Sequence, residues 1–269
     1  MRAVALHPDV LLVTSALLQL NCLVVRGPSE PEGTGGEQEE ETLLIDSPVL
    51  PDELDALPAL LEQARFPAPS GALATHGDWD HLLAPLAFPG ISLGCAESTA
   101  ERLQASPGEP QRDLRAFDED LMIERKRALA LGSPQALPVP GRCKLGSGEL
   151  ELHPATGHTP DGMAVLIPWA RVLAAGDYLS TVELPTLGDG GDLDAYLATL
   201  ERLGPLVGRC EHAVPGHGPV LDARAALRVL EEDAAYLHAL RRDGAAAQLP
   251  AGRRGAAQRR LHAGNLAAI

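Results

Sequence analysis

Four potential metal ligands lie within six residues of one polar segment of the chain, namely His76, Asp78, Asp80 and His81. The segment follows residues 72–75, a short apolar stretch that is expected to form a buried strand. In a tight loop, side chains two residues apart can point to one position, and the adjacent pair Asp80 and His81 can serve a second position close by. Imidazole and carboxylate donors together suit zinc, iron or manganese. This spacing therefore predicts a metal site at the end of the strand.

Three further polar residues stand where other expected strands end. They are His158, Asp177 and His217, which follow residues 149–153, 172–175 and 212–214. A glycine precedes each of them, and glycine lets the backbone approach an ion closely. Taken alone, each is more typical of a solvated turn or a helix cap. Together with the first segment, the three predict one site assembled from the ends of several strands.

Apolar runs and turn residues place strands and helices around these side chains. Strands are expected in residues 3–26 (two or three), 42–46, 72–75, 91–95, 137–176 (four) and 212–214. Helices are expected from Pro51 with a candidate break at Pro58, over 97–131 with breaks at Pro107 and Pro110, from Asp192, and from Asp222 to near Gly244. One group of strands and helices is followed by a second, which indicates two sheets flanked by helices.

The 269 residues are expected to form one domain over 1–244, followed by an Ala/Arg-rich tail over 245–269. Residues 27–41 are rich in Gly, Pro and Glu and are expected to form a solvated hairpin loop. Residues 188–192 are expected to form a flexible loop, and they lack the lysine of a phosphate-binding P-loop. The four cysteines form no C-x-x-C pair, so we expect reduced, mostly buried thiols and a cytoplasmic protein.

The chain is strongly acidic, with 22 Lys and Arg residues against 37 Asp and Glu residues and a formal net charge of −15. Such a chain repels a polyphosphate backbone unless its basic residues gather in one patch. The one gathering of arginines lies within residues 241–260. Residues 10–25 are too short and too polar to span a membrane. We therefore expect a small-molecule substrate, and neither a nucleic acid nor a membrane as partner.

The pattern of ligands resembles the metallo-β-lactamase superfamily of hydrolases. Its motif H-x-H-x-D-H is followed by a histidine in a G-H-T context, an aspartate in a G-D context and a final G-H-G. The matching residues are His76, Asp80, His81, His158, Asp177 and His217. The resemblance covers about residues 10–220, and the strand at 21–25 is similar to one in glyoxalase II-like members. It implies a four-layer αββα sandwich with a dinuclear metal site at one edge.

Asp78 stands where most members of this superfamily have the second histidine. Flavodiiron proteins, a branch of the same fold, resemble this chain in having an acid at that position. Asp78 is therefore either a carboxylate ligand or the mark of a weakened first site that leaves a single ion. The resemblance implies a first ion held by His76, Asp78 and His158. It implies a second held by Asp80, His81 and His217, with Asp177 bridging both. Two divalent ions are expected, zinc before iron or manganese.

The resemblance also implies how the site would act. A metal-activated hydroxide would attack the substrate, with Asp80 orienting the hydroxide and passing a proton to the leaving group. Tyr178, next to Asp177, is either a hydrogen-bond donor to a developing oxyanion or a tyrosine of the core. The first hypothesis for the reaction is hydrolysis of a small ester, thioester or lactone. The alternatives are a phosphodiesterase or nuclease, a diiron redox protein, and a non-catalytic metal-binding scaffold.

Overall fold

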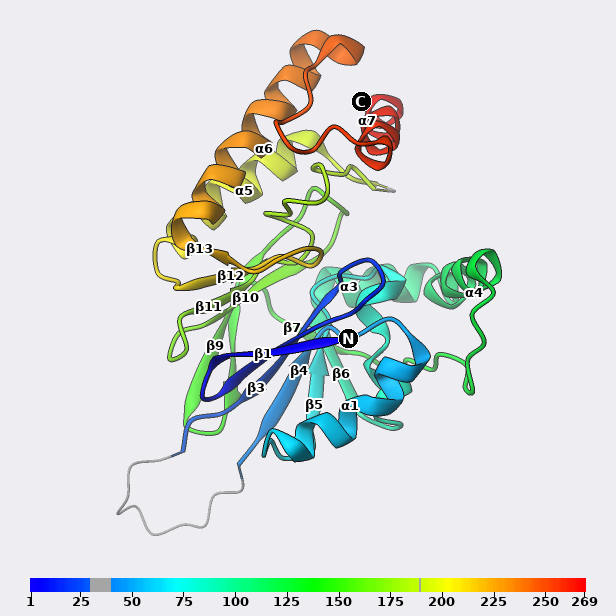
Figure 1. Cartoon of the computed structure of the whole chain (residues 1–269), viewed down its shortest axis with the longest axis vertical. Helices are drawn as coiled ribbons and strands as arrows, with labels where there is room; N and C mark the ends of the chain where they lie inside the picture. The colour runs from blue at the N-terminus through cyan, green and yellow to red at the C-terminus, as the bar shows by residue number, and fades with distance from the viewer. Residues whose placement is uncertain (30–39, 189) are drawn as a thin grey trace.

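Two β-sheets packed face to face form the centre of the molecule, and helices cover both outer faces (Figure 1). The computed structural model describes residues 1–29, 40–188 and 190–269. Most of the acidic loop expected over 27–41 therefore lies outside the described residues, as does Asp189 of the loop expected over 188–192. The arrangement is the αββα sandwich that the sequence predicts.

The first sheet has seven strands in the order β1 to β7. They are β1 (Arg2–His7), β2 (Val10–Thr14), β3 (Asn21–Arg26), β4 (Thr42–Ile45), β5 (Gly71–Leu73), β6 (Ser92–Ala96) and β7 (Gln135–Leu137). Strands β1 to β4 pair antiparallel, whereas β4 to β7 pair parallel. The carboxyl ends of β4 and β5 therefore meet at one edge, and the segment with the first four ligands begins there.

The second sheet has six strands in the order β13-β12-β11-β10-β9-β8. They are β8 (Gly141–Leu145), β9 (Gly148–Pro154), β10 (Met163–Ile167), β11 (Val172–Ala174), β12 (His212–Val214) and β13 (Leu221–Asp222). Only the β11–β12 pair is parallel within this described sheet. Asp177 follows β11 and His217 follows β12, so the parallel pairing brings both to the same edge.

Helices cover the outer face of each sheet and close three apolar layers. The helices are α1 (Pro51–Gln63), α2 (Ala84–Ala87), α3 (Glu97–Ala105), α4 (Glu109–Leu121), α5 (Leu193–Val207), α6 (Ala223–Asp243) and α7 (Ala256–Ala268), with 3-10 turns η1 (Trp79–Leu82) and η2 (Gly244–Ala246). Residues of α1 to α4 pack on the first sheet, and residues of α5 and α6 pack on the second.

Strand β2 shows how the sequence divides side chains between these layers. Leu12 points into the middle layer between the sheets, where it joins Leu23 and residues of the second sheet. Leu11 and Val13 point the other way, into the layer beneath the helices. Alternate residues of a strand face opposite sides of its sheet, so an unbroken apolar run marks a strand covered on both faces. Full burial of each such side chain contributes about 1.5–3 kcal/mol.

The helix boundaries follow the sequence predictions in part. Asp192 and Asp222 each accept a hydrogen bond from a backbone N–H three residues on, at 2.7 Å, and so act as N-caps, which confirms both predicted helix starts. Helix α1 continues through Pro58, because the buried leucines on both sides of the proline hold it against the sheet. The helical segment expected through residue 131 ends at Leu121, where Met122 adopts a left-handed conformation. Pro110 lies in the first turn of α4 and does not break it.

The C-terminal residues fold back onto the loop after β11 (Figure 1). Asn265 in α7 is fully buried; it accepts a hydrogen bond from the backbone N–H of Leu187 and donates one to the carbonyl oxygen of Pro185. The four cysteines are free thiols, three of them buried. In the described part of the chain, no helix has the length and apolar character needed to cross a membrane.

Candidate metal centre

All seven predicted metal ligands meet at the edge where the two sheets end. Around the position expected for the first metal ion, Asp78 Oδ2 lies 3.6 Å from Nε2 of His76 and 3.5 Å from Nε2 of His158. Asp177 Oδ2 lies 3.4 Å from the same His158 nitrogen. Ligands bound tetrahedrally at about 2.1 Å are about 3.4 Å from one another. These separations therefore match ligands of a single ion.

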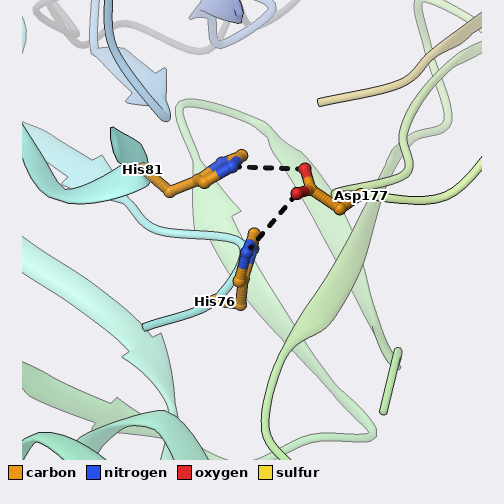
Figure 2. Close-up of side chains that lie close together, drawn as sticks. All are labelled: His76, His81 and Asp177. Atoms are coloured by element: carbon orange, nitrogen blue, oxygen red, sulfur yellow. Dashed lines mark ion pairs between the residues drawn. The ribbon is translucent and has the colours of Figure 1, made fainter. Parts of the chain in front are cut away.

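A second group of ligand atoms lies on the other side of Asp177. Nε2 of His217 is 3.4 Å from Asp80 Oδ2 and 3.5 Å from Asp177 Oδ2, and Nε2 of His81 is 3.2 Å from Asp177 Oδ1. Figure 2 shows His76 and His81 both pointing at the Asp177 carboxylate. Asp177 thus contacts both groups, as expected of a bridging residue. The structure brings the predicted residues together in the two sets that the sequence predicts.

Each ligand histidine is oriented by a partner at its other ring nitrogen. Nδ1 of His81 lies 2.9 Å from Asp46 Oδ2, that of His158 lies 2.7 Å from the Thr186 carbonyl, and that of His217 lies 3.0 Å from the Leu18 carbonyl. Nδ1 of His76 lies 3.2 Å from Thr75 Oγ1. An oxygen acceptor at Nδ1 keeps the proton there, so the lone pair of Nε2 faces the site.

Several of these inward-facing atoms have no hydrogen-bond partner among the described residues. They are Nε2 of His76, His81 and His158 and Oδ1 of Asp177, all of them buried. A buried polar atom without a partner costs about 1–3 kcal/mol, so folded proteins rarely keep four in one place. A pair of divalent cations would supply the missing partner to all four atoms. The residues present therefore fit the metal ions that the sequence predicts.

The negative charges of the carboxylates favour cations at the site. Burial alone would lower the pKa of His158 and His217, yet the nearby carboxylates of Asp78, Asp80 and Asp177 raise these pKa values to about 9 and about 10. In the same way, burial opposes ionisation of Asp78, but His76 and His158 hold its pKa well below the usual range. Without metal, protons on His81, His158 and His217 balance the carboxylates, and metal binding releases those protons.

Asp78 is held from behind by an arginine that the sequence does not single out. Nη1 of Arg102 in α3 lies 2.8 Å from Asp78 Oδ1 and 2.9 Å from Oδ1 of Asp161, which is 1% exposed. The other oxygen of Asp161 accepts hydrogen bonds from the Gly77 N–H at 2.9 Å and from Thr99 Oγ1 at 2.8 Å. One oxygen of Asp78 is thus turned toward Arg102 and the other toward the first metal position.

Asp46 is a second supporting residue that the sequence analysis does not assign. It accepts hydrogen bonds from the backbone N–H and the hydroxyl of Thr75, at 2.8 and 3.0 Å, besides holding His81. A signal for it exists, because Asp46 directly follows β4 just as other ligands follow their strands. Arg102 has no comparable signal, since its role arises only when α3 packs beside the ligand segment.

Glycine is required beside the bridging carboxylate. A Cβ on Gly216 would lie 2.1 Å from Oδ1 of Asp177 and 3.1 Å from the His81 ring. Asn21, at the start of β3, donates hydrogen bonds to the carbonyl oxygens of Pro215 and Gly218, at 2.9 and 2.8 Å, and so fixes the same loop. The first sheet therefore holds the loop that carries a ligand of the second sheet.

Two aromatic residues near the ligands belong to the packing. The hydroxyl of Tyr178 accepts a hydrogen bond from the backbone N–H of His158 at 3.1 Å, and its ring lies 4.5 Å from that of Tyr196. This contact supports the interpretation of Tyr178 as a core tyrosine that positions His158. Trp79, between the ligands of the first segment, packs on Phe117 of α4 with ring centroids 4.4 Å apart.

Comparisons with known proteins agree with this site. The family model described as the metallo-beta-lactamase superfamily matches residues 34–217. The chain is 26% identical over 136 residues to type 2 metallo-beta-lactamases of Bacillus sp. (strain 170) and Bacillus cereus, which is 49% of this chain and 53% of each of theirs. The chain thus spans about half the length of the curated relatives it matches.

Solved structures share the fold at low sequence identity. A metallo-beta-lactamase from Pontibacter korlensis has a TM-score of 0.57 at 15% identity, over 86% of this chain and 98% of that one. A stereoselective inverting sec-alkylsulfatase from Pseudomonas sp. has a TM-score of 0.68 at 15% identity, over 88% of this chain and 42% of that one. The glyoxalase II-like branch stays a prediction. The family match and the arrangement of the ligands agree, and the chain belongs to the metallo-β-lactamase superfamily.

Proposed function

We propose that this protein is a metal-dependent hydrolase that cleaves a small ester, thioester or lactone. The observation that carries the proposal is the convergence of buried, unpartnered ring nitrogens of His76, His81 and His158 on the Asp177 carboxylate. Family membership alone does not define a reaction, because one fold hosts many chemistries. The complete set of ligands favours catalysis over a scaffold that has lost it.

The two groups of side chains would each hold one divalent ion. His76, Asp78 and His158 form the first group. Asp80, His81 and His217 form the second, and Asp177 reaches both. Four imidazoles combined with carboxylates suit zinc, which we place first, and they also accept iron or manganese. When bound, such ions polarise a carbonyl oxygen and lower the pKa of a water molecule to about 7.

Other side chains would orient the attacking water, transfer a proton and hold the ligands in place. Asp80 points one oxygen toward His217 Nε2 at 3.4 Å and keeps a small exposed area, so it can orient the attacking water and carry a proton to the leaving group. Asp46, Thr186 and the Leu18 carbonyl keep the histidines in the tautomer that faces the ions. Arg102, which Asp78 shares with Asp161, offsets part of the charge that Asp78 adds.

A cavity behind His158 supports a small substrate with an apolar substituent. It has a volume of about 610 Å³ and lies between α7 and the loop after β11. Leu187 and Leu261 line it together with several glycines and alanines, and Arg260 stands among them. Thr186, whose carbonyl orients His158, also lines this cavity. We propose that this region selects the substrate.

The basic segment gives little support to the nuclease alternative. Arg253 is buried at 3% exposure, so it does not contribute to a surface patch. Arg241 pairs with Asp194, and Arg242 pairs with Asp243. The basic patch expected within residues 241–260 is therefore smaller and less positively charged than the sequence suggests. Phosphodiesters still belong in the substrate panel as the test of this alternative.

The proposed function is tested by metal analysis combined with a substrate panel. The panel contains an aryl ester, a thioester, a lactone, a β-lactam as suggested by the names of the Bacillus relatives, an alkyl sulfate and an aryl phosphodiester. We expect two zinc ions per chain and hydrolysis of the first three substrates. Asp80→Asn should slow this hydrolysis by about 100-fold or more, as loss of a proton-transfer group does.

The same experiment distinguishes the alternatives. Asp78→Ala should lower the metal content from two ions to about one if Asp78 is a ligand, whereas Asp78→His should keep two. A content of two irons with oxygen consumption would replace the hydrolase by the redox alternative. Two bound ions with no hydrolysis of any ester, thioester or lactone would contradict the proposed substrate class.

A further inference from the structure

Glu183 places a carboxylate beside the second group of ligands, although no motif of the sequence includes it. An oxygen of Glu183, an oxygen of Asp177 and a ring nitrogen of His217 all lie within 4.8 Å of one another. The side chain of Glu183 is partly buried, and it makes no hydrogen bond or ion pair with any other described residue. A sheltered carboxylate without a cation is costly, and it faces a position where a cation is expected.

The backbone around Glu183 is fixed directly to a ligand. The N–H of Glu183 donates to Ser180 Oγ at 3.0 Å, and the same hydroxyl donates to the carbonyl oxygen of His217 at 2.9 Å. The turn formed by residues 180–183 is therefore attached to the residue whose ring serves the second metal position. The backbone of Glu183 therefore cannot move far from that position without loss of these bonds.

The C-terminal segment holds the same turn from the other side. Nη1 of Arg253 donates to the carbonyl oxygens of Ser180 and Glu183, both at 3.0 Å, and to Asp233 Oδ1 in α6 at 2.6 Å. Both Arg253 and Asp233 are almost fully buried. A buried arginine persists only where most of its donors are satisfied, and here it joins α6, the tail and the turn.

We propose that Glu183 is a further ligand of the second metal ion and that Arg253 positions it. The inference rests on the proposed two-ion site. Two ligands of one ion, with bonds of about 2.1–2.3 Å, lie at most about 4.2–4.6 Å apart. The ligand atoms of Glu183, Asp177 and His217 lie within 4.8 Å of one another, so a change in the side-chain torsions of Glu183 brings its oxygen within reach of the same ion.

This ligand changes the chemistry of the second position. Its donors become two imidazoles and three carboxylates, those of Asp80, Asp177 and Glu183. The first position keeps two imidazoles and two carboxylates. Oxygen donors favour harder ions, and a fifth donor favours geometries other than the tetrahedron. Glu183 therefore raises the affinity of the second position for Mn²⁺ relative to its affinity for Zn²⁺.

The test measures metal binding in the full-length protein after removal of bound metal. Glu183→Gln keeps the size of the side chain and removes its charge. We expect the second Zn²⁺ to bind at least about 10-fold more weakly while the first binds as in the wild type. The electron paramagnetic resonance spectrum of bound Mn²⁺ should also change, which a merely structural residue would not cause.

Glu232→Gln is the matched control, because Glu232 contacts the same Arg253 at 3.2 Å but is about half exposed on its side chain. It should bind both ions as the wild type does. Arg253→Lys keeps a cation for Asp233, but its shorter side chain places the ammonium farther from the two carbonyl oxygens, so it should weaken the second ion and leave the first unchanged. Thermal unfolding of each metal-free variant checks that the fold is intact.

The result that overturns the inference is a Glu183→Gln protein that binds the second Zn²⁺ with wild-type affinity and gives the wild-type Mn²⁺ spectrum. A wild-type chain that binds only one ion would overturn it as well. Two bound ions without hydrolysis would contradict the proposed function alone, since the comparison of Glu183→Gln with Glu232→Gln does not depend on activity.

Discussion

Asp78 and Arg102 act as a pair at the scale of single residues. The carboxylate takes the place of a neutral imidazole and adds a negative charge. The guanidinium of Arg102, 2.8 Å away, offsets part of that charge, and Asp161 shares the same guanidinium. The arginine also fixes which oxygen of Asp78 faces the metal position, because it is itself held by Asp161 at 2.9 Å. Asp78, which replaces the histidine of the family motif, is thus held in place by Arg102 of α3.

Removal of this support should weaken the first metal position. In Arg102→Met, Asp78 loses the partner that orients it and the buried Asp161 loses its counter-ion. We expect the first Zn²⁺ to bind about 10-fold or more weakly, as for loss of a residue that orients a ligand. We also expect a loss of about 1–3 kcal/mol in the free energy of unfolding. Equilibrium dialysis and urea unfolding measure the two effects.

Arg112→Met is the control for that variant. Arg112 lies in α4, and one of its nitrogens donates to the carbonyl oxygen of Pro107 at 3.0 Å. It makes no contact with Asp78 among the described residues. Equal Zn²⁺ affinity in the two variants would show that Arg102 does not orient Asp78.

Gly216→Ala should disturb the bridging ligand directly. The new Cβ would meet Asp177 Oδ1 at 2.1 Å, so either the carboxylate or the loop must move. We expect a loss of about 1–3 kcal/mol in stability and reduced occupancy of both metal positions. Gly264→Ala in α7 is the control, because nothing lies within 4 Å of its Cβ position and alanine favours a helix. Unchanged metal content in Gly216→Ala would show that a Cβ at residue 216 does not displace the Asp177 carboxylate.

At the scale of secondary-structure elements, helix α1 fixes the connection between β2 and β3. Glu53, in its first turn, is buried and accepts hydrogen bonds from the Ser15 hydroxyl and from the Ala16 N–H, the latter at 2.8 Å. Burial alone would raise the pKa of Glu53, but these hydrogen bonds outweigh it and lower the pKa. The helix is thereby attached to the connection between β2 and β3, which carries the Leu18 carbonyl that orients His217.

The lowered pKa of Glu53 gives stability a defined pH dependence. Its contribution is present above the unfolded pKa of about 4.3 and is lost as the pH falls through the lower, folded value. Glu53→Gln should therefore be less stable than the wild type by about 1–3 kcal/mol at pH 7. The difference should shrink below about pH 4. Urea unfolding across this range measures it, and a difference that stays constant would contradict the assignment.

The elements show what the sequence can and cannot predict. Strand ends predict the seven ligands, because strands that run in the same direction end at one edge of a sheet. Asp177 and His217 follow the parallel neighbours β11 and β12, and His158 follows β9, which runs in the same direction as β11 two strands away. The side-chain oxygens of Asp192 and Asp222 predict two helix starts. Arg102 and Glu183 were not predictable, since neither lies at a strand end and each acquires its role from a contact distant in sequence. The continuity of α1 through Pro58 depends likewise on tertiary packing.

At the scale of the whole molecule, the C-terminal segment joins the fold through the ion pair between Arg253 and Asp233. A chain shortened to residues 1–244 would remove Arg253, the counter-ion of Asp233. We expect it to lose about 3–5 kcal/mol of stability, the typical cost of breaking a buried pair. A chain ending at residue 254 keeps Arg253 and should lose less. Equal thermal stability of the two shortened chains would contradict a structural role for this pair and would support a domain that ends near residue 244.

The histidine partners come from segments far apart in the chain, and this has a consequence for how the protein unfolds. Asp46 follows β4, the Leu18 carbonyl lies between β2 and β3, and the Thr186 carbonyl follows β11. Ions bound at the site would therefore link the two sheets to each other, because their ligands and the partners of those ligands come from both sheets. At a free metal concentration of about 1,000 times the dissociation constant, binding adds about 4 kcal/mol to the native state. Amide hydrogens of both sheets should then exchange at a common rate in the loaded protein, and at separate rates once the ions are removed.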